Sequence, residues 1–332
     1  MDNEIVVFFN FKQDIFYSFC RTLQNQIKTL QMTIEALNQQ YGIKDVAHFS
    51  QESANGLVFL TINNSLASAR IALYGAQILS YKPIEQPDVL WVSDQSHFKE
   101  GKAIRGGIPV CFPWFGPHAT DRTMPQHGFA RTSNWQVQAV KQLTDGATAI
   151  QLMLEQSDET LKLWPFPFRA VINFVVGVTL QVTFRVTNTG TTSFQYSDAL
   201  HTYFNISDIA AIELDGFDNS PYYEAFGDQL FQQTDTSLHP DIENNRRYIQ
   251  HSGEAIITDP GYNRKIRVGK TGSKVTVVWN PGPITSKNFT DMSAGGYKNF
   301  ICIEPANAYA GIDMVDVAPG EDFSISTTIK ID

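Results

Sequence analysis

The sequence has little cysteine and no long apolar run. Its 332 residues include three cysteines, Cys20, Cys111 and Cys302, which lie far apart and never form a CxxC arrangement. An odd number of scattered cysteines argues against a disulfide framework or a zinc site, so we expect a reducing compartment. No apolar run is long enough to cross a bilayer. The apolar patch at residues 5–9 follows acidic residues, which is the wrong charge order for a secretory signal. We therefore expect a cytoplasmic protein with no membrane partner.

Positive charge is also scarce. The chain has 25 lysines and arginines against 34 acidic residues, for a net charge of −9. Nucleic-acid binding needs clustered cations, so we expect no nucleic-acid partner. A small phosphorylated ligand needs only one or two local arginines and is not excluded. The GxGxxG, GxxxxGK[ST], GxSxG and HExxH patterns are absent as well, so no nucleotide-binding, serine-hydrolase or zinc-protease signature is present.

What the sequence has in quantity is strand-like alternation. In "TLQVTFRVTN", residues 179–188, apolar and polar side chains alternate without interruption, as expected of a strand with one buried face. "KVTVVW", "NFICIE" and "FSISTTIKI" behave similarly, and turn signals such as "NPGP" and "APG" separate the runs. One short helix is expected in "SDETLKLWP", with Ser157 or Asp158 as its cap and Pro165 as its stop. The pattern predicts an all-β protein, a large antiparallel β-sandwich with one core.

The first 41 residues follow a different pattern. Leu23, Ile27, Leu30, Ile34 and Leu37 recur at spacings of four and three, which predicts one stripe of an amphipathic helix. The stripe is shorter than three heptads, which favours a helix docked on the main domain over a coiled-coil contact with a partner. We therefore predict an N-terminal helical extension at residues 1–41 and a single β-sandwich domain at 42–332.

Two glycine-containing loops carry candidate ligand-binding residues. "AIRGGIPVCFPWFGP" places Arg105 directly before a glycine pair, where backbone can approach a ligand closely. "PQHGFAR" brings Gln126, His127 and Arg131 together, and such side chains hydrogen-bond sugar hydroxyls or phosphate oxygens. The alternative for each is a structural loop with a solvated arginine.

Two strand-like segments carry candidate proton-transfer residues. In "DALHTYFN" an extended backbone would place His201 and Tyr203 on one face. In "NFICIEPAN", Phe300, Cys302 and Glu304 would share a face, and we expect Pro305 to end the strand. A carboxylate on such an apolar strand has its pKa raised, which suits a general acid or base. The alternatives are a structural core histidine and a glutamate that reaches water.

Taken together, five segments in order resemble the hexose-6-phosphate mutarotases, or glucose-6-phosphate 1-epimerases, of the aldose 1-epimerase superfamily. They are "GKAIRGGIPVCFPWFGP", "PQHGFARTSNW", "ALHTYFNISDI", "VVWNPGP" and "DMSAGGYKNFICIEPA". The resemblance runs from about residue 43 to the C-terminus. It implies a β-sandwich of the galactose-mutarotase type that interconverts the α and β anomers of a hexose 6-phosphate, with no metal or organic cofactor, and we expect a monomer.

The resemblance also implies roles for particular residues. His201 matches the family's catalytic acid and Glu304 its catalytic base, so that protonated His201 would donate to the ring oxygen. Arg105, Gln126 and Arg131 match substrate-binding positions, with His127 beside them.

One position departs from the family pattern. Where the family has the aspartate of a D-R-x-Y motif, this sequence has Asn245 in "ENNRRYI". The uncharged amide favours one alternative, a sugar-phosphate-binding or regulatory module that has lost turnover. A second alternative, an epimerase of unphosphorylated sugars, also stays open, and the two arginines argue against it.

Overall fold

The computed structural model describes residues 32–52, 56–224, 227–240, 243–308 and 313–332. The chain divides into two compact units, Met1–Gln40 and Tyr41–Asp332. In the first, Ile34 and Leu37 of the expected helical stripe lie in helix α2 (Ile34–Tyr41). Leu23, Ile27 and Leu30 lie outside the described residues. Within the described residues, no helix is long and apolar enough to cross a membrane.

The second unit is built from antiparallel sheets. The nine-stranded sheet has the order β16 (Ser237–Leu238), β13 (Glu213–Asp215), β18 (Ala255–Asp259), β19 (Arg264–Thr271), β23 (Asp322–Ile331), β9 (Thr179–Asn188), β8 (Phe168–Val176), β7 (Thr148–Glu155) and β6 (Gln136–Gln142). The eight-stranded sheet has the order β15 (Leu230–Gln232), β14 (Pro221–Glu224), β17 (Asn244–Tyr248), β20 (Val275–Asn280), β21 (Phe300–Asn307), β11 (Asp198–Leu200) and β5 (Val110–Cys111), with β12 (Tyr203–Asn205) also pairing with β21.

Two smaller sheets and a few short helices complete this unit. The four-stranded sheet is β1 (Ala47–Gln51), β2 (Val58–Asn63), β3 (Ala67–Ala72) and β4 (Gln77–Pro83), and the two-stranded sheet is β10 (Phe194–Tyr196) and β22 (Val315–Val317). The helices are α3 (Asp158–Leu163), α4 (Gly282–Thr285) and the 3₁₀ turns η1 (Ala130–Thr132), η2 (Ser286–Asn288) and η3 (Gly296–Asn299). Ser157 caps α3 by accepting a hydrogen bond from the Thr160 N–H, which confirms the short helix expected there.

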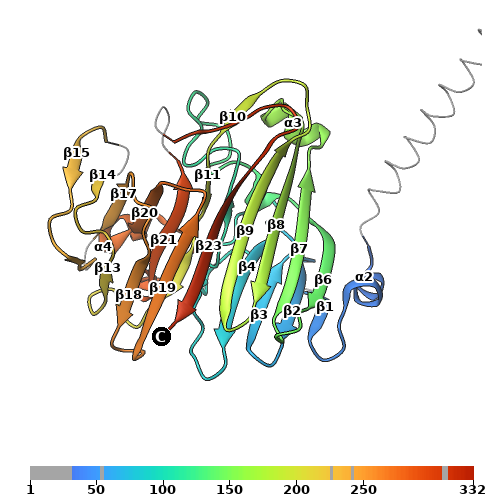
Figure 1. Cartoon of the computed structure of the whole chain (residues 1–332), viewed down its shortest axis with the longest axis horizontal. Helices are drawn as coiled ribbons and strands as arrows, with labels where there is room; N and C mark the ends of the chain where they lie inside the picture. The colour runs from blue at the N-terminus through green and yellow to red at the C-terminus, as the bar shows by residue number, and fades with distance from the viewer. Residues whose placement is uncertain (1–31, 53–55, 225–226, 241–242, 309–312) are drawn as a thin grey trace, which may run out of the picture. The chain divides into compact units, whose positions relative to one another are not determined.

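The sheets form two layers. Figure 1 shows the nine-stranded sheet in front of the four-stranded and eight-stranded sheets. In β9 the side chains of Leu180, Val182, Phe184 and Val186 are fully buried while their neighbours are exposed or half-buried. This alternation places one face of β9 in the core between the layers, as its period-two sequence predicts. The expected antiparallel β-sandwich is confirmed.

An aromatic cluster fills the part of the core behind the first glycine-rich loop. The Phe112 ring makes edge-on or steeply inclined contacts with Phe168, Phe184, Tyr196 and Trp164, with ring centroids 5.3–5.6 Å apart. Such edge-to-face pairs add to the hydrophobic gain from burying the rings. Because Phe112 anchors the segment that follows Arg105, the loop is fixed at one end by the core.

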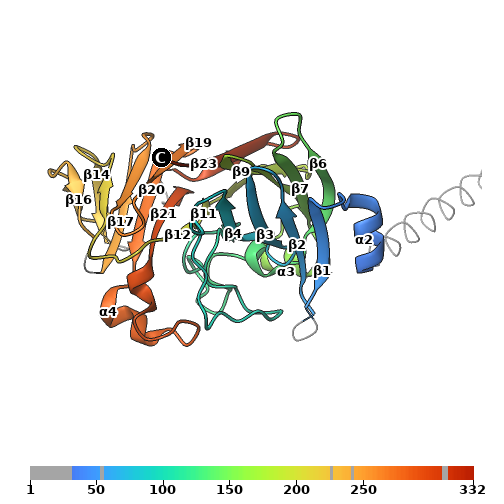
Figure 2. The same cartoon turned by 90° about the horizontal axis from the view of Figure 1, so that it is seen from below.

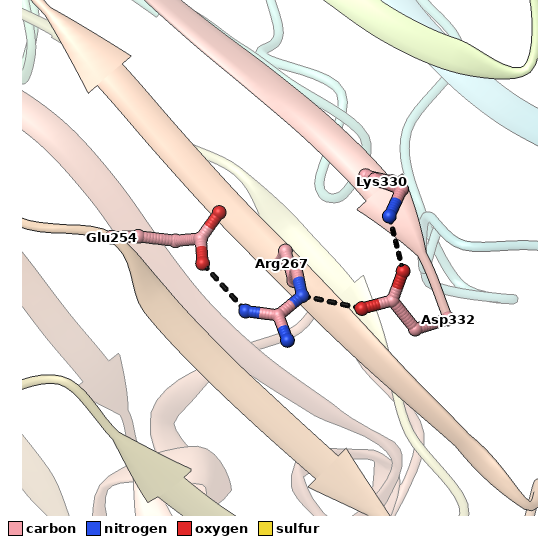
Figure 3. Close-up of polar contacts among 4 residues, drawn as sticks. All are labelled: Glu254, Arg267, Lys330 and Asp332. Atoms are coloured by element: carbon pink, nitrogen blue, oxygen red, sulfur yellow. Dashed lines mark hydrogen bonds and ion pairs between the residues drawn. The ribbon is translucent and has the colours of Figure 1, made fainter.

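Charged contacts on the outer face link the last strand to its neighbour (Figure 3). Arg267 of β19 pairs with Glu254 at 2.8 Å and with Asp332, and Lys330 of β23 pairs with the same Asp332 at 2.5 Å. These side chains are partly exposed, so water and salt screen their charges and each pair adds little to stability. The network thus reinforces, rather than determines, the β19–β23 register.

Candidate active site

His201 lies in a break between two short strands that pair with the same neighbour. Strand β11 ends at Leu200, β12 begins at Tyr203, and both run antiparallel to β21. The His201 backbone N–H donates to the Pro109 carbonyl at 3.0 Å, which continues the pairing of β11 with β5 by one residue. The rings of His201 and Tyr203 stack, with centroids 4.8 Å apart and planes 11° apart. The prediction that these two side chains share a face is confirmed.

Glu304 lies inside β21, not at its end. The expectation that Pro305 ends the strand is wrong, because β21 continues to Asn307. The Ile303 N–H donates toward Thr202, and alternate residues of a strand direct their N–H groups to the same side. The nitrogen of Pro305 therefore faces Leu200, the last residue of β11, whose carbonyl accepts a hydrogen bond from the Thr202 N–H instead, so the missing N–H of Pro305 costs no ladder bond.

His201 and Glu304 form a buried pair. His201 Nε2 lies 3.4 Å from Glu304 Oε1, and the two residues are 7% and 1% exposed. His201 Nδ1 and Glu304 Oε2 are buried and have no hydrogen-bond partner among the described residues. The expected alternative in which Glu304 reaches water is therefore wrong. Two unsatisfied buried atoms are costly unless a ligand supplies their partners.

Burial decides where the proton of this pair resides. Burial, with the charges of Arg131 and Arg105, lowers the pKa of His201 to about 3. Burial raises the pKa of Glu304 well above its ordinary value, and Arg131 opposes that rise. The raised carboxyl pKa agrees with the sequence-based expectation. The protonated histidine does not, because without a ligand the single proton stays on Glu304, whose neutral form costs less to bury.

The "QHGFAR" loop lies against this pair. The His127 ring is 5.6 Å from the His201 ring, centroid to centroid, and its edge faces it. His127 Nδ1 accepts a hydrogen bond from the Gly116 N–H at 3.1 Å. A neutral ring with Nδ1 as acceptor carries its proton on Nε2. Burial lowers the pKa of His127 well below its ordinary value, which keeps the ring neutral. His127 can therefore donate one hydrogen bond through Nε2 but is a poor acid.

Gln126 and Arg131 flank this ring. Arg131 Nη2 donates to the Gln126 carbonyl at 2.7 Å, and the Gln126 amide nitrogen lies 3.4 Å from His127 Nε2. The loop depends on Gly128, which has φ +71° and bridges to Phe112. The structure thus brings Gln126, His127 and Arg131 together with His201.

Arg105 lies near Tyr203 and His201 and is held by two further contacts. Its Nε donates to Asp291 Oδ1 at 2.7 Å, and its Cζ lies 4.2 Å from the centroid of the Phe289 ring. Its charge also acts on Tyr203 and on His201. The guanidinium is therefore both paired and stacked, which fixes its direction. Figure 2 shows α4, which precedes Phe289 and Asp291 in the chain, beside the eight-stranded sheet.

The position of Asn245 relative to the His201–Glu304 pair follows from the strand register. Asn245 lies on β17 opposite Trp279 of β20, and Trp279 lies opposite Cys302 of β21. Directly opposed residues share a sheet face, so Asn245 is on the face that bears Glu304. Trp279 lies between Asn245 and Cys302 in the order of the strands, and its ring centroid is 5.7 Å from that of His201.

Sequence reasoning missed several residues that contact Arg105 or the His201–Glu304 pair. Asp291, Phe289 and Trp279 contact Arg105 or His201, but no local pattern marks them because their contacts depend on the fold. Cys302 could have been found, since alternation in "NFICIE" places it on the same face as Glu304.

Comparison with known proteins agrees with this arrangement. The family model described as aldose 1-epimerase matches residues 58–330. An Escherichia coli protein named "Putative glucose-6-phosphate 1-epimerase" is 37% identical over 264 residues, covering 78% of this chain and 86% of that protein. The crystal structure of a Salmonella typhimurium protein described as a "putative mutarotase" superposes with a TM-score of 0.81 at 30% identity, covering 93% of this chain and 99% of that one.

A more distant structure shows the same fold. The Lactobacillus acidophilus protein described as a galactose mutarotase related enzyme has a TM-score of 0.65 at 17% identity, covering 82% of this chain and 97% of that one. The family match spans most of the chain, and the buried His201–Glu304 pair lies within it. The chain belongs to the aldose 1-epimerase family and is an isomerase that acts as a mutarotase.

Proposed function

We propose that this mutarotase interconverts the α and β anomers of a hexose 6-phosphate, with glucose 6-phosphate as the first substrate to test. The observation that carries the proposal is the buried His201–Glu304 pair, 3.4 Å apart, with the charges of Arg131 and Arg105 acting on His201. Anomer exchange requires one group that takes a proton from the anomeric hydroxyl and one that gives a proton to the ring oxygen. The pair supplies both groups with a single shared proton.

The proton moves in a closed cycle. When the sugar binds, its hydroxyls hydrogen-bond the Glu304 carboxylate and stabilise its charged form, so the proton passes to His201. Glu304 then takes the proton of the anomeric hydroxyl while His201 donates to the ring oxygen. The ring opens to the aldehyde, the C1–C2 bond rotates, and closure in the reverse sense gives the other anomer. Each positioned transfer contributes about 10²–10⁴-fold to the rate.

The arginines support a phosphorylated substrate. Arg105 is held by Asp291, and Arg131 Nη2 is held by the Gln126 carbonyl. Both charges act on His201, so an anion bound to them would lie near the acid–base pair. Guanidinium groups bind phosphate through charge-assisted, often bidentate, hydrogen bonds. The name of the Escherichia coli relative points to the same substrate.

The His127 ring and Asn245 take supporting roles in this proposal. His127 would donate through Nε2 to a sugar hydroxyl, because the Gly116 N–H fixes its tautomer. Asn245 would contact the sugar through its amide, which carries no charge. A monomer in the cytoplasm and a helical extension at residues 1–41 stay predictions.

Magnetisation-exchange NMR on glucose 6-phosphate anomers tests the reaction directly. Purified protein should accelerate exchange above the spontaneous rate, and His201→Ala or Glu304→Gln should remove nearly all of that acceleration. The exposed pair His239 and Glu213, 3.8 Å apart, offers matched controls, so His239→Ala and Glu213→Gln should leave exchange intact. Full exchange in His201→Ala would refute the role given to it. Calorimetric binding without exchange would identify a binding module instead.

The phosphate contact has its own test. Arg105→Ala should raise KM for glucose 6-phosphate at least tenfold, with a much smaller effect on free glucose, because only the phosphate loses a charged partner. Arg169→Ala is the control, since Arg169 pairs with Glu155 on an exposed strand surface. Equal effects on both sugars would show that Arg105 does not bind the phosphate.

A further inference from the structure

Cys302 places a sulfur beside the acid–base pair. The described residues contain a group of three potential metal ligands, His201, Cys302 and Glu304, in which one donor atom from each lies within 4.8 Å of the others. Cys302 and Glu304 are two positions apart on β21, and His201 lies in the break between β11 and β12. All three are buried. This arrangement gathers one sulfur, one nitrogen and one oxygen, which are donor types that zinc accepts, within 4.8 Å of one another.

A second observation indicates that the group can accept a ligand. Within the part of the chain that the structure describes, Glu304 Oε2 and His201 Nδ1 are buried without a hydrogen-bond partner, and the two residues are only 1% and 7% exposed. The 3.4 Å contact between His201 Nε2 and Glu304 Oε1 is itself long for a hydrogen bond. The pair is therefore poorly satisfied where it lies, and a cation bound through one imidazole nitrogen and the carboxylate would supply a partner for both side chains.

We propose that His201, Cys302 and Glu304 bind a thiophilic divalent cation, Zn²⁺ or Cd²⁺, when the sugar is absent, and that this cation excludes the sugar. Three protein ligands of the S, N and O type suit a tetrahedral zinc ion with one open position. Mg²⁺ and Ca²⁺ prefer oxygen-rich sites and are not expected to bind. The inhibition of anomer exchange rests on the proposed function, whereas the binding of the cation does not.

The proton balance of this binding is defined. The cation takes the Cys302 thiolate and the Glu304 carboxylate as anionic ligands and neutral His201 as the third. The thiol proton and the proton shared by the pair both leave to solvent, so two protons are released per cation. The complex is then neutral, since the two negative charges offset the 2+ ion, and a neutral complex costs least to bury. Affinity must therefore rise steeply with pH.

The test is a titration of the full-length protein with Cd²⁺. Formation of a sulfur–cadmium bond should produce a thiolate-to-metal charge-transfer band in the ultraviolet, with two protons released into weakly buffered solution. Cys302→Ser should abolish the band and weaken binding more than about 100-fold, since even changes outside the ligand set cost 10–100-fold. Cys111→Ser is the matched control, because Cys111 is the other buried free cysteine among the described residues.

The exchange assay completes the test. Zn²⁺ should inhibit wild-type exchange competitively with glucose 6-phosphate, a chelator should reverse the inhibition, and Cys302→Ser should lose this sensitivity whatever its basal rate. A missing band, or one that persists in Cys302→Ser, overturns the metal proposal and leaves the proposed function standing. A Cys302-dependent band in a protein that never accelerates exchange refutes the proposed function and retains the metal site.

Discussion

Asp198 offers a quantitative test of how burial controls charge in this fold. It lies on β11, three residues before His201, and is fully buried. Oδ1 accepts a hydrogen bond from Asn307 Nδ2 at 2.9 Å, while Oδ2 is buried and has no partner among the described residues. The hydrogen bonds to this carboxylate do not replace its solvation, so burial raises the pKa of Asp198 to about 7 and the charge of Asp313 adds to the rise. Replacing Asp198 by asparagine removes the titration and keeps the shape of the side chain.

The magnitude follows from the two pKa values. Because the folded-state pKa exceeds the ordinary value of 3.8, the folded protein holds the proton more tightly than the unfolded chain. The stabilisation is complete below pH 3.8 and is lost as the pH rises through about 7. At about 1.36 kcal/mol per pKa unit, the total loss is about 4 kcal/mol. The difference in unfolding free energy between wild type and Asp198→Asn should therefore shift by about 4 kcal/mol between pH 4 and pH 8, in favour of the variant.

Urea unfolding followed by tryptophan fluorescence at several pH values measures this difference. Any constant effect of the new amide cancels, because only the change with pH is compared. Asp316→Asn is the matched control, since Asp316 lies on the exposed face of β22 and accepts a hydrogen bond from Gln195. A difference between wild type and Asp198→Asn that stays constant from pH 4 to pH 8 would refute the argument from burial.

Three further outcomes are expected. The acid limb of log kcat/KM against pH should fall well below pH 6.5, because the pKa of His201 is lowered to about 3; a limb near 6.5 in exchange NMR would contradict the burial of that ring. Asp291→Asn should raise KM for glucose 6-phosphate several-fold with little change in kcat, because Arg105 loses its partner at 2.7 Å; steady-state kinetics with an unchanged KM would show that the pair does not orient the guanidinium. Gly128→Ala should lower the melting temperature by the equivalent of at least about 2 kcal/mol, since an added Cβ would lie 2.0 Å from a backbone carbonyl oxygen. Gly101→Ala, with positive φ but open space around it, should cost less, and equal shifts in calorimetry would remove the clash as the cause.

The fold class could be predicted because it depends on a local signal. Alternation in "TLQVTFRVTN" reports which side chains of β9 are buried, and the structure buries the four apolar ones fully. Ser157 could likewise be identified as a helix cap from its immediate neighbours. Strand order could not be predicted in this way, because the pairing of β11 and β12 with β21 joins segments that are distant in the sequence.

The candidate site shows the same limit. The shared face of His201 and Tyr203 follows from the extended backbone and is confirmed by the stacked rings. The end of the strand at Pro305 was predicted wrongly. The neighbouring strand β11 ends at Leu200, opposite Pro305, so β21 can continue past the proline without losing a ladder bond. The location of the shared proton was also missed, since the pKa of His201 depends on burial and on two arginines from other segments.

The break between β11 and β12 has a consequence for how the family can diversify. Both strands are fastened to β21, so a single ladder determines the spacing between the imidazole and the carboxylate. The groups proposed to recognise the sugar and its phosphate come instead from separate connecting segments. Insertions or substitutions there can alter substrate preference while the spacing of the proposed acid–base pair is unchanged. New specificities can therefore arise on this scaffold without rebuilding that pair.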